Sequence, residues 1–529
     1  MTRTLYRNAR FFTADEGGWA DAVIVDGDSF AFVGAEGDAP ATDAVVDLGG
    51  RAVLPGFTDA HTHLLMMGEA LGQVGLTDAR SLDEIQERLR RARATAAAVL
   101  RGRGWLFDAI PGGAPTADMI DAVVSDIPVY LDANDYHSCW VNSAALTELG
   151  ITRDTPDPIG GRIERDADGE ATGMLYETAA QQYAWAHRDA MTTDEQRDAA
   201  VTRVVESYLA AGVTGAVDMA FDDLALAALG RAADRGALPL RIAAHWFVAN
   251  TGDDEENLAQ VAEAARRART DTNGVRVIGI KLVLDGTIDA CTAAMRAPYA
   301  DGSNAAPIWP AERLAAVVAA ADAAGLQVAM HAIGDEASTL ALDAVEEAIA
   351  ANGERPRRHR IEHLEYAAPG TAERMKRLGV TASMQPVHAD PAIFTNWAAQ
   401  LGDHRVDRAF AWPEYEDAGT LLAFSTDAPT APHAALANMF VATTRASALD
   451  PDVPAVHPHF ALPLDRAIAH ATRDAAASIG DGEWRGRIAV GQAADFIVLD
   501  TDPFAAGPES LLTTRVVRTV IAGRTAYEI

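Results

Sequence analysis

The sequence predicts an α/β protein built on a (β/α)8 TIM barrel, with an inserted subdomain and a small β-sandwich formed by both termini. Three observations predict this fold. Strand-like apolar runs alternate with alanine-rich helical stretches through the middle of the chain, which is typical of a parallel sheet covered by helices on both faces. Eight such runs are present, the number that closes a barrel. The two chain ends instead carry short alternating strands separated by Gly and Asp turns.

The predicted barrel strands are continuous apolar runs of the kind that parallel sheets bury on both faces. They span residues 52–63, 213–220, 240–248, 277–286, 326–335, 359–366, 380–386 and 421–429. About 150 residues separate the first strand from the second, far more than one crossover needs. We therefore expect an inserted subdomain at roughly 75–200, where the Gly- and Pro-rich stretches PGGAP and PDPIGG occur.

The expected domain boundaries follow from these elements. Residues 55–479 are expected to form the barrel together with its insertion. Residues 1–54 and 480–529 are expected to form the composite β-sandwich together, because both ends carry short strands and turns of the same type.

The composition of the chain argues against several functional classes. Its 529 residues carry a formal net charge of −32, whereas nucleic acids and anionic membranes bind basic surfaces. No apolar run approaches the ~20 residues that cross a bilayer, and the N-terminus lacks the features of a secretory signal. Cys139 and Cys291 are the two cysteines, too few for a disulfide framework. We expect a cytoplasmic protein without nucleic-acid or membrane partners.

Histidines and an aspartate occur where several predicted strands end. The first strand ends in DAHTH, so His61 and His63 are two positions apart and point to the same face of a strand. His331, His363 and Asp427 lie at the carboxyl ends of three later strands. Barrel enzymes assemble their active sites at that rim. The convergence of these side chains predicts a metal site.

Lys281 stands inside the apolar run GIKLVLDG and is one of two lysines in a chain with 44 lysines and arginines together. One interpretation is a buried structural pair with a carboxylate such as Asp285. The other is a neutral amine that captures CO2 and becomes a carbamate, whose two oxygens bridge two cations. Burial and nearby cations lower the pKa of the amine and favour that form, whereas an arginine stays charged.

The motifs as a set resemble the amidohydrolase superfamily, and most closely its amidohydrolase-3 branch, which includes N-substituted formamide deformylase and YtcJ-like proteins. The resemblance covers nearly the whole chain and is carried by LPGFTDAHTHL, YHSCWVNSAAL, GGRIERDADGEATGMLYE, KLVLDGTIDACTAAM, MHAIGD, RIEHLEY, SMQPVHAD, STDAP and GRIAVGQAADFIVLDTDP. It implies a barrel with a composite β-sandwich and a divalent metal, usually zinc. In related amidohydrolases a carboxylated lysine ends the fourth strand, which is where Lys281 falls.

The resemblance implies one or two zinc ions per chain and a complete set of metal ligands. That set is His61, His63, Lys281, His331, His363 and Asp427. Asp427 is also the expected catalytic residue: it would accept a proton from a metal-activated water, the source of the attacking hydroxide, and return it to the leaving amine. Glu362 and Asp335 are expected at the surface or at a helix cap.

The expected function is hydrolysis of a carbon–nitrogen bond other than a peptide bond, of the N-formyl or N-acyl amide type. One alternative is a mononuclear deaminase or a cyclic-amide hydrolase on the same scaffold. A non-catalytic scaffold protein is a further alternative, against which the complete ligand set argues. The expected partner is a small-molecule amide, and barrels of this kind often form homodimers.

Six residues are candidates for substrate contacts, and packing or support of another site residue is the alternative for them. The candidates are His137, Tyr176, Glu177, Gln385, His388 and Arg296. Arg296 is considered as a carboxylate clamp, with a surface salt bridge as the competing interpretation. The stretch TIDACTAAM departs from the sequence expected for this branch of the family, because Asp289 and Cys291 occupy the places of a small residue and an arginine. An acidic residue there would favour a cationic or amine-bearing substrate.

Overall fold

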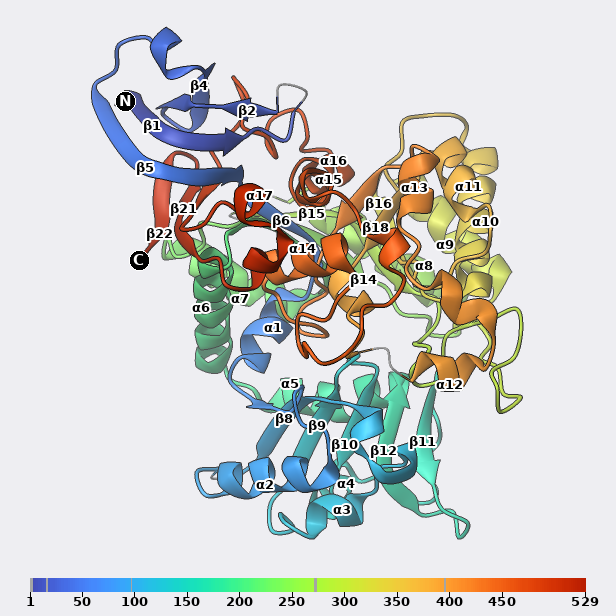
Figure 1. Cartoon of the computed structure of the whole chain (residues 1–529). Coiled ribbons are helices and arrows are strands. Elements are labelled where there is room, and N and C mark those ends of the chain that lie inside the picture. The colour runs from blue at the N-terminus through green and yellow to red at the C-terminus, as the bar shows by residue number, and fades with distance from the viewer. Residues whose placement is uncertain (1–2, 16–17, 97, 271–273, 394–395) are drawn as a thin grey trace.

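A computed structural model describes residues 3–15, 18–96, 98–270, 274–393 and 396–529 of the chain (Figure 1). Its central feature is an eight-stranded sheet in which each strand pairs in parallel with the next strand of the sheet along the chain. The strands are β6 (Phe57–Thr62), β13 (Val213–Phe221), β14 (Arg241–Phe247), β15 (Val275–Val283), β16 (Gln327–Ala332), β17 (Arg360–His363), β18 (Thr381–Met384) and β19 (Leu422–Phe424). Each coincides with one of the eight predicted strands, so the barrel prediction is confirmed.

The first and last strands of this sheet meet through their extensions. The backbone N–H of Asp427, just beyond β19, donates to the carbonyl oxygen of His61 in β6 at 2.8 Å. The N–H of His63 donates to the carbonyl oxygen of Ala428 at 3.0 Å. These bonds bring the segment after β19 against the end of β6, which places residues far apart in sequence on one rim.

Helices cover the barrel, and several begin at side-chain N-caps. Thr193 forms a capping box with Gln196, and Asp222 and Asp253 cap the next two helices. The helices around the barrel are α1 (Leu64–Ala70), α6 (Asp194–Ala210), α7 (Asp223–Asp234), α8 (Asp254–Arg267), α9 (Ala311–Ala323), α10 (Asp335–Asn352), α11 (Thr371–Leu378), α12 (Trp397–Leu401), α13 (Pro413–Asp417), α14 (Ala435–Thr444), α15 (Leu464–Ala471) and α16 (Arg473–Ser478). The short α5 (Ala186–Met191) instead lies on the sheet that is inserted between β6 and β13 in the chain (Figure 1). Asp335 lies in the first turn of α10, where a carboxylate stabilises the helix dipole.

Both chain ends contribute to one β-rich sheet, as the sequence predicts. Its order is β22-β21-β20-β5-β1-β3-β4, with β2 paired to β1. The strands are β1 (Arg3–Phe12), β2 (Trp19–Ala20), β3 (Ala22–Asp26), β4 (Ser29–Gly34), β5 (Ala44–Pro55), β20 (Phe496–Leu499), β21 (Val516–Ile521) and β22 (Arg524–Glu528), and the short α17 (Pro503–Ala506) follows β20. Antiparallel pairing of Val53 with Val498 joins the two termini. The sheet has an apolar core of its own, which includes Phe11, Phe30 and Phe496.

The chain segment that connects β6 to β13 forms a third sheet. This sheet lies on the opposite side of the barrel from the terminal sheet (Figure 1). Its order is β11-β12-β10-β9-β8-β7. The elements are β7 (Val74–Gly75), β8 (Leu100–Trp105), β9 (Val129–Ala133), β10 (Ser138–Val141), β11 (Gly161–Arg165) and β12 (Ala171–Glu177), with helices α2 (Leu82–Arg93), α3 (Ala117–Asp121) and α4 (Ser143–Leu149). Trp105 and Trp140 are buried in its core, and the loops of this sheet reach the rim that carries the histidines.

Within the described parts of the chain, no helix combines the length and the apolar character that a bilayer-spanning helix needs.

Candidate metal centre and active site

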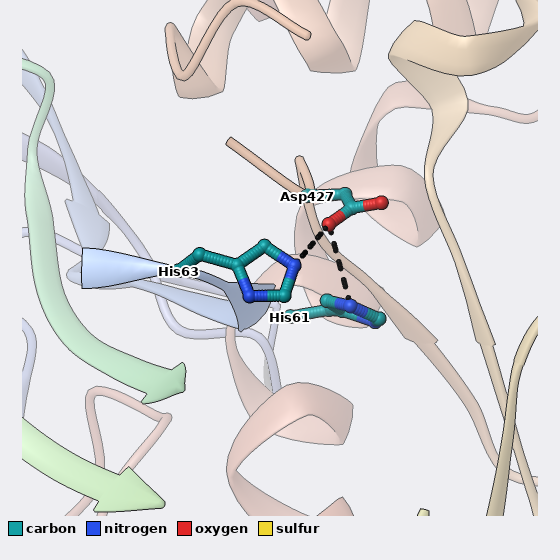
Figure 2. A group of neighbouring side chains, drawn as sticks. All are labelled: His61, His63 and Asp427. Atoms are coloured by element: carbon teal, nitrogen blue, oxygen red, sulfur yellow. Dashed lines mark ion pairs between the residues drawn. The ribbon is translucent and has the colours of Figure 1, made fainter. Parts of the chain in front are cut away.

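Two histidines and an aspartate from opposite ends of the barrel sheet converge at one point (Figure 2). The Nε2 atom of His63 lies 3.0 Å from Oδ1 of Asp427, and Nε2 of His61 lies 3.3 Å from the same oxygen. The donor atoms of the three side chains all lie within 4.8 Å of one another. Imidazole nitrogens and a carboxylate oxygen are common zinc ligands, so this group can hold one cation.

The hydrogen bonding of Asp427 fits a cation at this position. Its Oδ1 atom is buried and has no hydrogen-bond partner among the described residues, and the same is true of Nδ1 of His63. Burial opposes ionisation of Asp427, but the imidazoles of His61 and His63 outweigh that effect and lower the pKa of the carboxyl. A buried carboxylate oxygen without a donor is costly unless a cation compensates it.

The tautomer of His61 is fixed from behind by Glu362. The Nδ1 atom of His61 lies 2.8 Å from Oε2 of Glu362, and because a carboxylate only accepts, Nδ1 carries the proton. The lone pair of Nε2 is then left facing Asp427. Burial and the nearby Lys281 lower the pKa of His61, which keeps that nitrogen free to act as a ligand.

Glu362 is fully buried, so its expected place at the surface is wrong. Its carboxylate receives two hydrogen bonds from Arg360, at 2.5 Å from Nε and 3.1 Å from Nη2. Both side chains belong to a strand that is buried on both faces, and each supplies the charge that the other needs. Charged residues within a predicted buried strand were the signal that could have identified this pair.

Lys281 reaches the same cluster from β15. Its Nζ atom lies 3.3 Å from Nε2 of His61. Burial lowers the pKa of the amine to about 8, which raises the fraction of the neutral form. The structural alternative paired Lys281 with Asp285, but the Asp285 carboxylate instead accepts three backbone N–H bonds, from residues 294, 333 and 334.

A second group that can hold a metal shares Asp427 with the first. It consists of His363, His388 and Asp427, whose donor atoms lie within 4.8 Å of one another. Oδ2 of Asp427 lies 3.8 Å from Nδ1 of His363 and 3.8 Å from Nε2 of His388. His388 was expected to contact substrate, and the structure places it beside the predicted ligands, with Nδ1 at 3.0 Å from Oε1 of Glu365.

His331 joins the cluster through its ring. The ring centroids of His331 and His363 are 4.3 Å apart, and those of His331 and His137 are 5.1 Å apart. The Nε2 atom of His331 lies 3.4 Å from the carbonyl oxygen of Gly286 and 3.5 Å from Oδ1 of Asp285. Its role as a metal ligand stays a prediction.

Three predicted substrate contacts lie close to this cluster. His137 lines the adjacent pocket, and its Nδ1 atom lies 2.6 Å from Oε2 of Glu177. Gln385 supports His363, with Oε1 at 2.9 Å from Nδ1 of that ring, and donates to Oγ of Ser425 at 2.9 Å. Glu177 and Gln385 therefore orient histidines that face the pocket.

The structure does not bring the other two predicted substrate contacts to this pocket. The ring of Tyr176 packs against the guanidinium of Arg162 at 4.5 Å. The side chain of Arg296 is 49% exposed and donates to Oγ1 of Thr339 at 2.6 Å. Arg296 thus forms the surface contacts that were the competing interpretation, since its guanidinium lies against α10.

Asp59 is a supporting residue that the sequence did not reveal. Its carboxylate accepts hydrogen bonds from the backbone N–H of Thr426 at 2.9 Å, from its hydroxyl at 2.5 Å and from Tyr208 at 3.1 Å. These bonds tie β6 to the segment that carries Asp427. Burial raises the pKa of Asp59 to about 6. Asp59 lies two residues before His61 on the same strand, and this spacing was the available signal.

The pocket beside the cluster encloses about 730 Å³ of space between atoms, part of it open to solvent. His331, His363 and Asp427 line it. Loops of the inserted sheet contribute Trp105, Phe107, Asn134, Asp135 and His137 to its walls, and the segments after β15, β17 and β18 contribute Asp289, Glu365, Trp397 and Phe410. A molecule in this pocket can therefore reach the candidate metal ligands.

An eight-stranded parallel barrel with histidines and an aspartate gathered at its strand ends is the architecture of a metal-dependent hydrolase. The chain belongs to the amidohydrolase family, whose profile matches residues 44–527. It is 31% identical to the putative amidohydrolase YtcJ of Bacillus subtilis over 96% of this chain and 95% of that protein.

Two further relatives cover almost the whole chain. N-substituted formamide deformylase of Arthrobacter pascens is 28% identical over 98% of this chain and 97% of its own length. Among solved structures, an uncharacterised metal-dependent hydrolase of Pyrococcus horikoshii is 25% identical, with a TM-score of 0.75 over 96% of this chain and 99% of that one. The family prediction is confirmed, and the chain is a member of the metal-dependent amidohydrolases.

Proposed function

We propose that the protein hydrolyses carbon–nitrogen bonds other than peptide bonds, in N-formyl or N-acyl amines, with one or two divalent cations, zinc being the expected ion. The observation that carries this proposal is the group of His61, His63 and Asp427, whose carboxylate lines an open pocket. The formamide deformylase relative, similar along nearly its whole length, supports the amide class.

The cation would be held by His61, His63 and Asp427, with carboxylated Lys281, His331 and His363 available for a second ion. When bound, a divalent cation lowers the pKa of a coordinated water and polarises a carbonyl group. The neutral amine of Lys281 is the form that reacts with CO2. Its Nζ atom lies 3.3 Å from Nε2 of His61, and this proximity supports a carbamate as a further ligand.

Asp427 is suited to move a proton because its two oxygens face different surroundings. Oδ1 faces His61 and His63, whereas Oδ2 faces His363 and His388 toward the pocket. One oxygen can serve as a ligand while the other accepts a proton from the attacking water. The protonated carboxyl then donates to the nitrogen of the leaving amine as general acid.

His137 would orient the substrate from the inserted sheet. Its Nδ1–H donates to Glu177, which fixes the ring, and the ring itself lines the pocket next to His331. A fixed imidazole there can hold the amide group of the substrate relative to Asp427. Such positioning lowers the entropic part of the activation free energy of hydrolysis.

The test is a direct assay of amide hydrolysis. The purified chain, supplied with zinc and bicarbonate, is incubated with a panel of formamides and N-acyl amines, and NMR measures the free amine and the carboxylate released. Metal content is determined on the same sample. Hydrolysis of at least one amide by metal-loaded protein is expected. Full metal loading with no amide hydrolysed anywhere in the panel would contradict the proposal.

A further inference from the structure

The pocket that leads to Asp427 is strongly acidic. Five carboxylates line it, and no lysine or arginine does so within the described ranges. They are Asp108, Asp135, Asp289, Glu365 and Asp427. His388 pairs with Glu365 at 3.0 Å, His137 pairs with Glu177 at 2.6 Å, and Asp427 belongs to the candidate metal group, so these imidazoles form no ion pair with Asp289 in the described parts of the chain. A negative charge on a ligand would be repelled where it approaches Asp289.

Asp289 is the carboxylate in this wall that most lacks a counter-charge. Its side chain is partly buried and forms no ion pair with any residue that the structure describes. Oδ2 of Asp289 receives one long hydrogen bond, from Nε1 of Trp397 at 3.4 Å. Burial and the carboxylates of Asp135 and Glu365 raise the pKa of Asp289 to about 7. A cation beside it would relieve this unfavourable environment.

A second, independent feature of the same wall is an acceptor without a donor. The Oδ1 atom of Asn396 is buried, and no described residue donates a hydrogen bond to it. Asn396 lines the pocket together with Asp289, and its Nδ2 atom faces the backbone oxygen of Asp289 at 3.5 Å. The wall therefore offers acceptors in excess of donors. A protonated amine, which has three donors and no acceptor, is the group that complements it.

Aromatic rings complete the pocket. Trp105 and Phe107 come from the inserted sheet, and Trp397 and Phe410 come from the barrel segments opposite. Aromatic faces attract cations as well as apolar groups. The Trp397 indole, which donates to Asp289, joins the aromatic wall directly to the acidic one.

We propose that the substrate of this site carries a protonated nitrogen on an aromatic or apolar segment, at a distance from the bond that is cleaved. The cleavage step in this inference rests on the proposed amide hydrolysis. The recognition of the protonated nitrogen rests only on the residues that line the pocket. The scissile amide lies beside His331, His363 and Asp427, the apolar segment packs between the aromatic rings, and the protonated nitrogen lies at Asp289 and Asn396. Amides with a free carboxylate are excluded.

The first experiment compares three substrates that differ in one group. They are formamides of 2-phenylethylamine whose para position carries an aminomethyl, an ethyl or a carboxymethyl group, which are cationic, neutral and anionic at pH 7.5. For the native protein we expect kcat/KM to be at least about tenfold higher for the aminomethyl compound than for the ethyl compound, and lowest for the carboxymethyl compound. Equal rates, or a preference for the anionic amide, would overturn the inference while leaving the proposed function intact.

The second experiment removes the charge of Asp289. In Asp289→Asn the ratio of kcat/KM for the aminomethyl compound to kcat/KM for the ethyl compound should fall by about tenfold relative to the native protein. The matched control is Asp301→Asn, an exposed carboxylate in the same connection between β15 and α9, which should keep the native preference. A native preference in Asp289→Asn would remove this carboxylate from cation recognition.

A binding measurement separates this inference from the proposed function. The para-substituted 2-phenylethanols with the same three groups contain no amide, and calorimetry measures their affinity for the native protein and for Asp289→Asn. Preferential binding of the aminomethyl compound that depends on Asp289 supports the pocket assignment even if no formamide is hydrolysed. Affinity that does not distinguish the three charges contradicts it even if formamides are hydrolysed.

Discussion

The Nδ1 atom of His61 lies 2.8 Å from Oε2 of Glu362, and both side chains are fully buried. The two residues come from β6 and β17, about 300 positions apart. Because Arg360 in turn holds Glu362 with two hydrogen bonds, the imidazole of His61 has a fixed orientation and a fixed tautomer. The candidate metal group is therefore supported by an ion pair from a neighbouring part of the barrel.

This relationship predicts that Glu362→Gln lowers the affinity for zinc by about 10- to 100-fold. A neutral amide polarises the Nδ1–H of His61 less than a carboxylate does, so Nε2 becomes a weaker ligand. Competition with a zinc chelator measures the affinity, at a temperature where circular dichroism shows the variant to be folded. The exposed Glu373→Gln on α11 is the control and should bind zinc as the native chain does. Native affinity in Glu362→Gln would contradict the supporting role.

Lys281 allows a test against the other lysine of the chain. Lys281→Ala should lose most of the activity and part of the bound metal, because the carbamate that would bridge two ions cannot form. Lys376→Ala, on the exposed side of α11, should change neither. Metal analysis and amide hydrolysis are measured for both variants.

A rescue experiment sharpens the prediction for Lys281. Acetate or propionate, which supplies two carboxylate oxygens without a covalent link, should partly restore both metal content and activity to Lys281→Ala. An unchanged zinc content in this variant would defeat the carbamate idea, since the bridging ligand would then be dispensable.

Asp427→Asn should keep the fold but reduce kcat by roughly 10³- to 10⁴-fold. The amide retains one oxygen that can face His61 and His63, so much of the metal should remain bound. It cannot accept and return a proton, which is the step assigned to Asp427. Rates of amide hydrolysis and metal content are compared with those of the native protein, and near-native rates would remove Asp427 from proton transfer.

The barrel could be predicted because its determinants are local. Each strand is a continuous apolar run, and the spacing of His61 and His63 alone places both rings on one face of a strand. The position of Asp427 after the last strand followed from the rule that barrel sites lie at the carboxyl ends. These properties are readable without knowing which strands are neighbours.

The supporting contacts could not be predicted because they depend on distant pairings. Glu362 and Asp59 hydrogen-bond to residues 301 and 367 positions away. The residues next to Glu362 and Asp59 in the sequence do not indicate which distant residues these partners are. Arg296 shows the same dependence, because the sequence left a carboxylate clamp and a surface salt bridge both open, and its guanidinium lies beside Glu336 in the acidic first turn of α10. Which of several charged side chains turns inward is decided by tertiary packing.

The raised pKa of Asp289, about 7 against an ordinary 3.8, predicts how stability depends on pH. The folded protein keeps this proton over a range in which the unfolded chain has lost it, so the carboxyl lowers the free energy of unfolding as pH rises from about 4 to 7, by at most about 4 kcal/mol. Asp289→Asn removes that loss. Relative to the native protein, the variant should therefore gain stability between pH 4 and pH 8, as measured by urea unfolding in the same buffers. Asp301→Asn should show no such gain, and a pH-independent difference for Asp289→Asn would show that Asp289 ionises normally in the folded state.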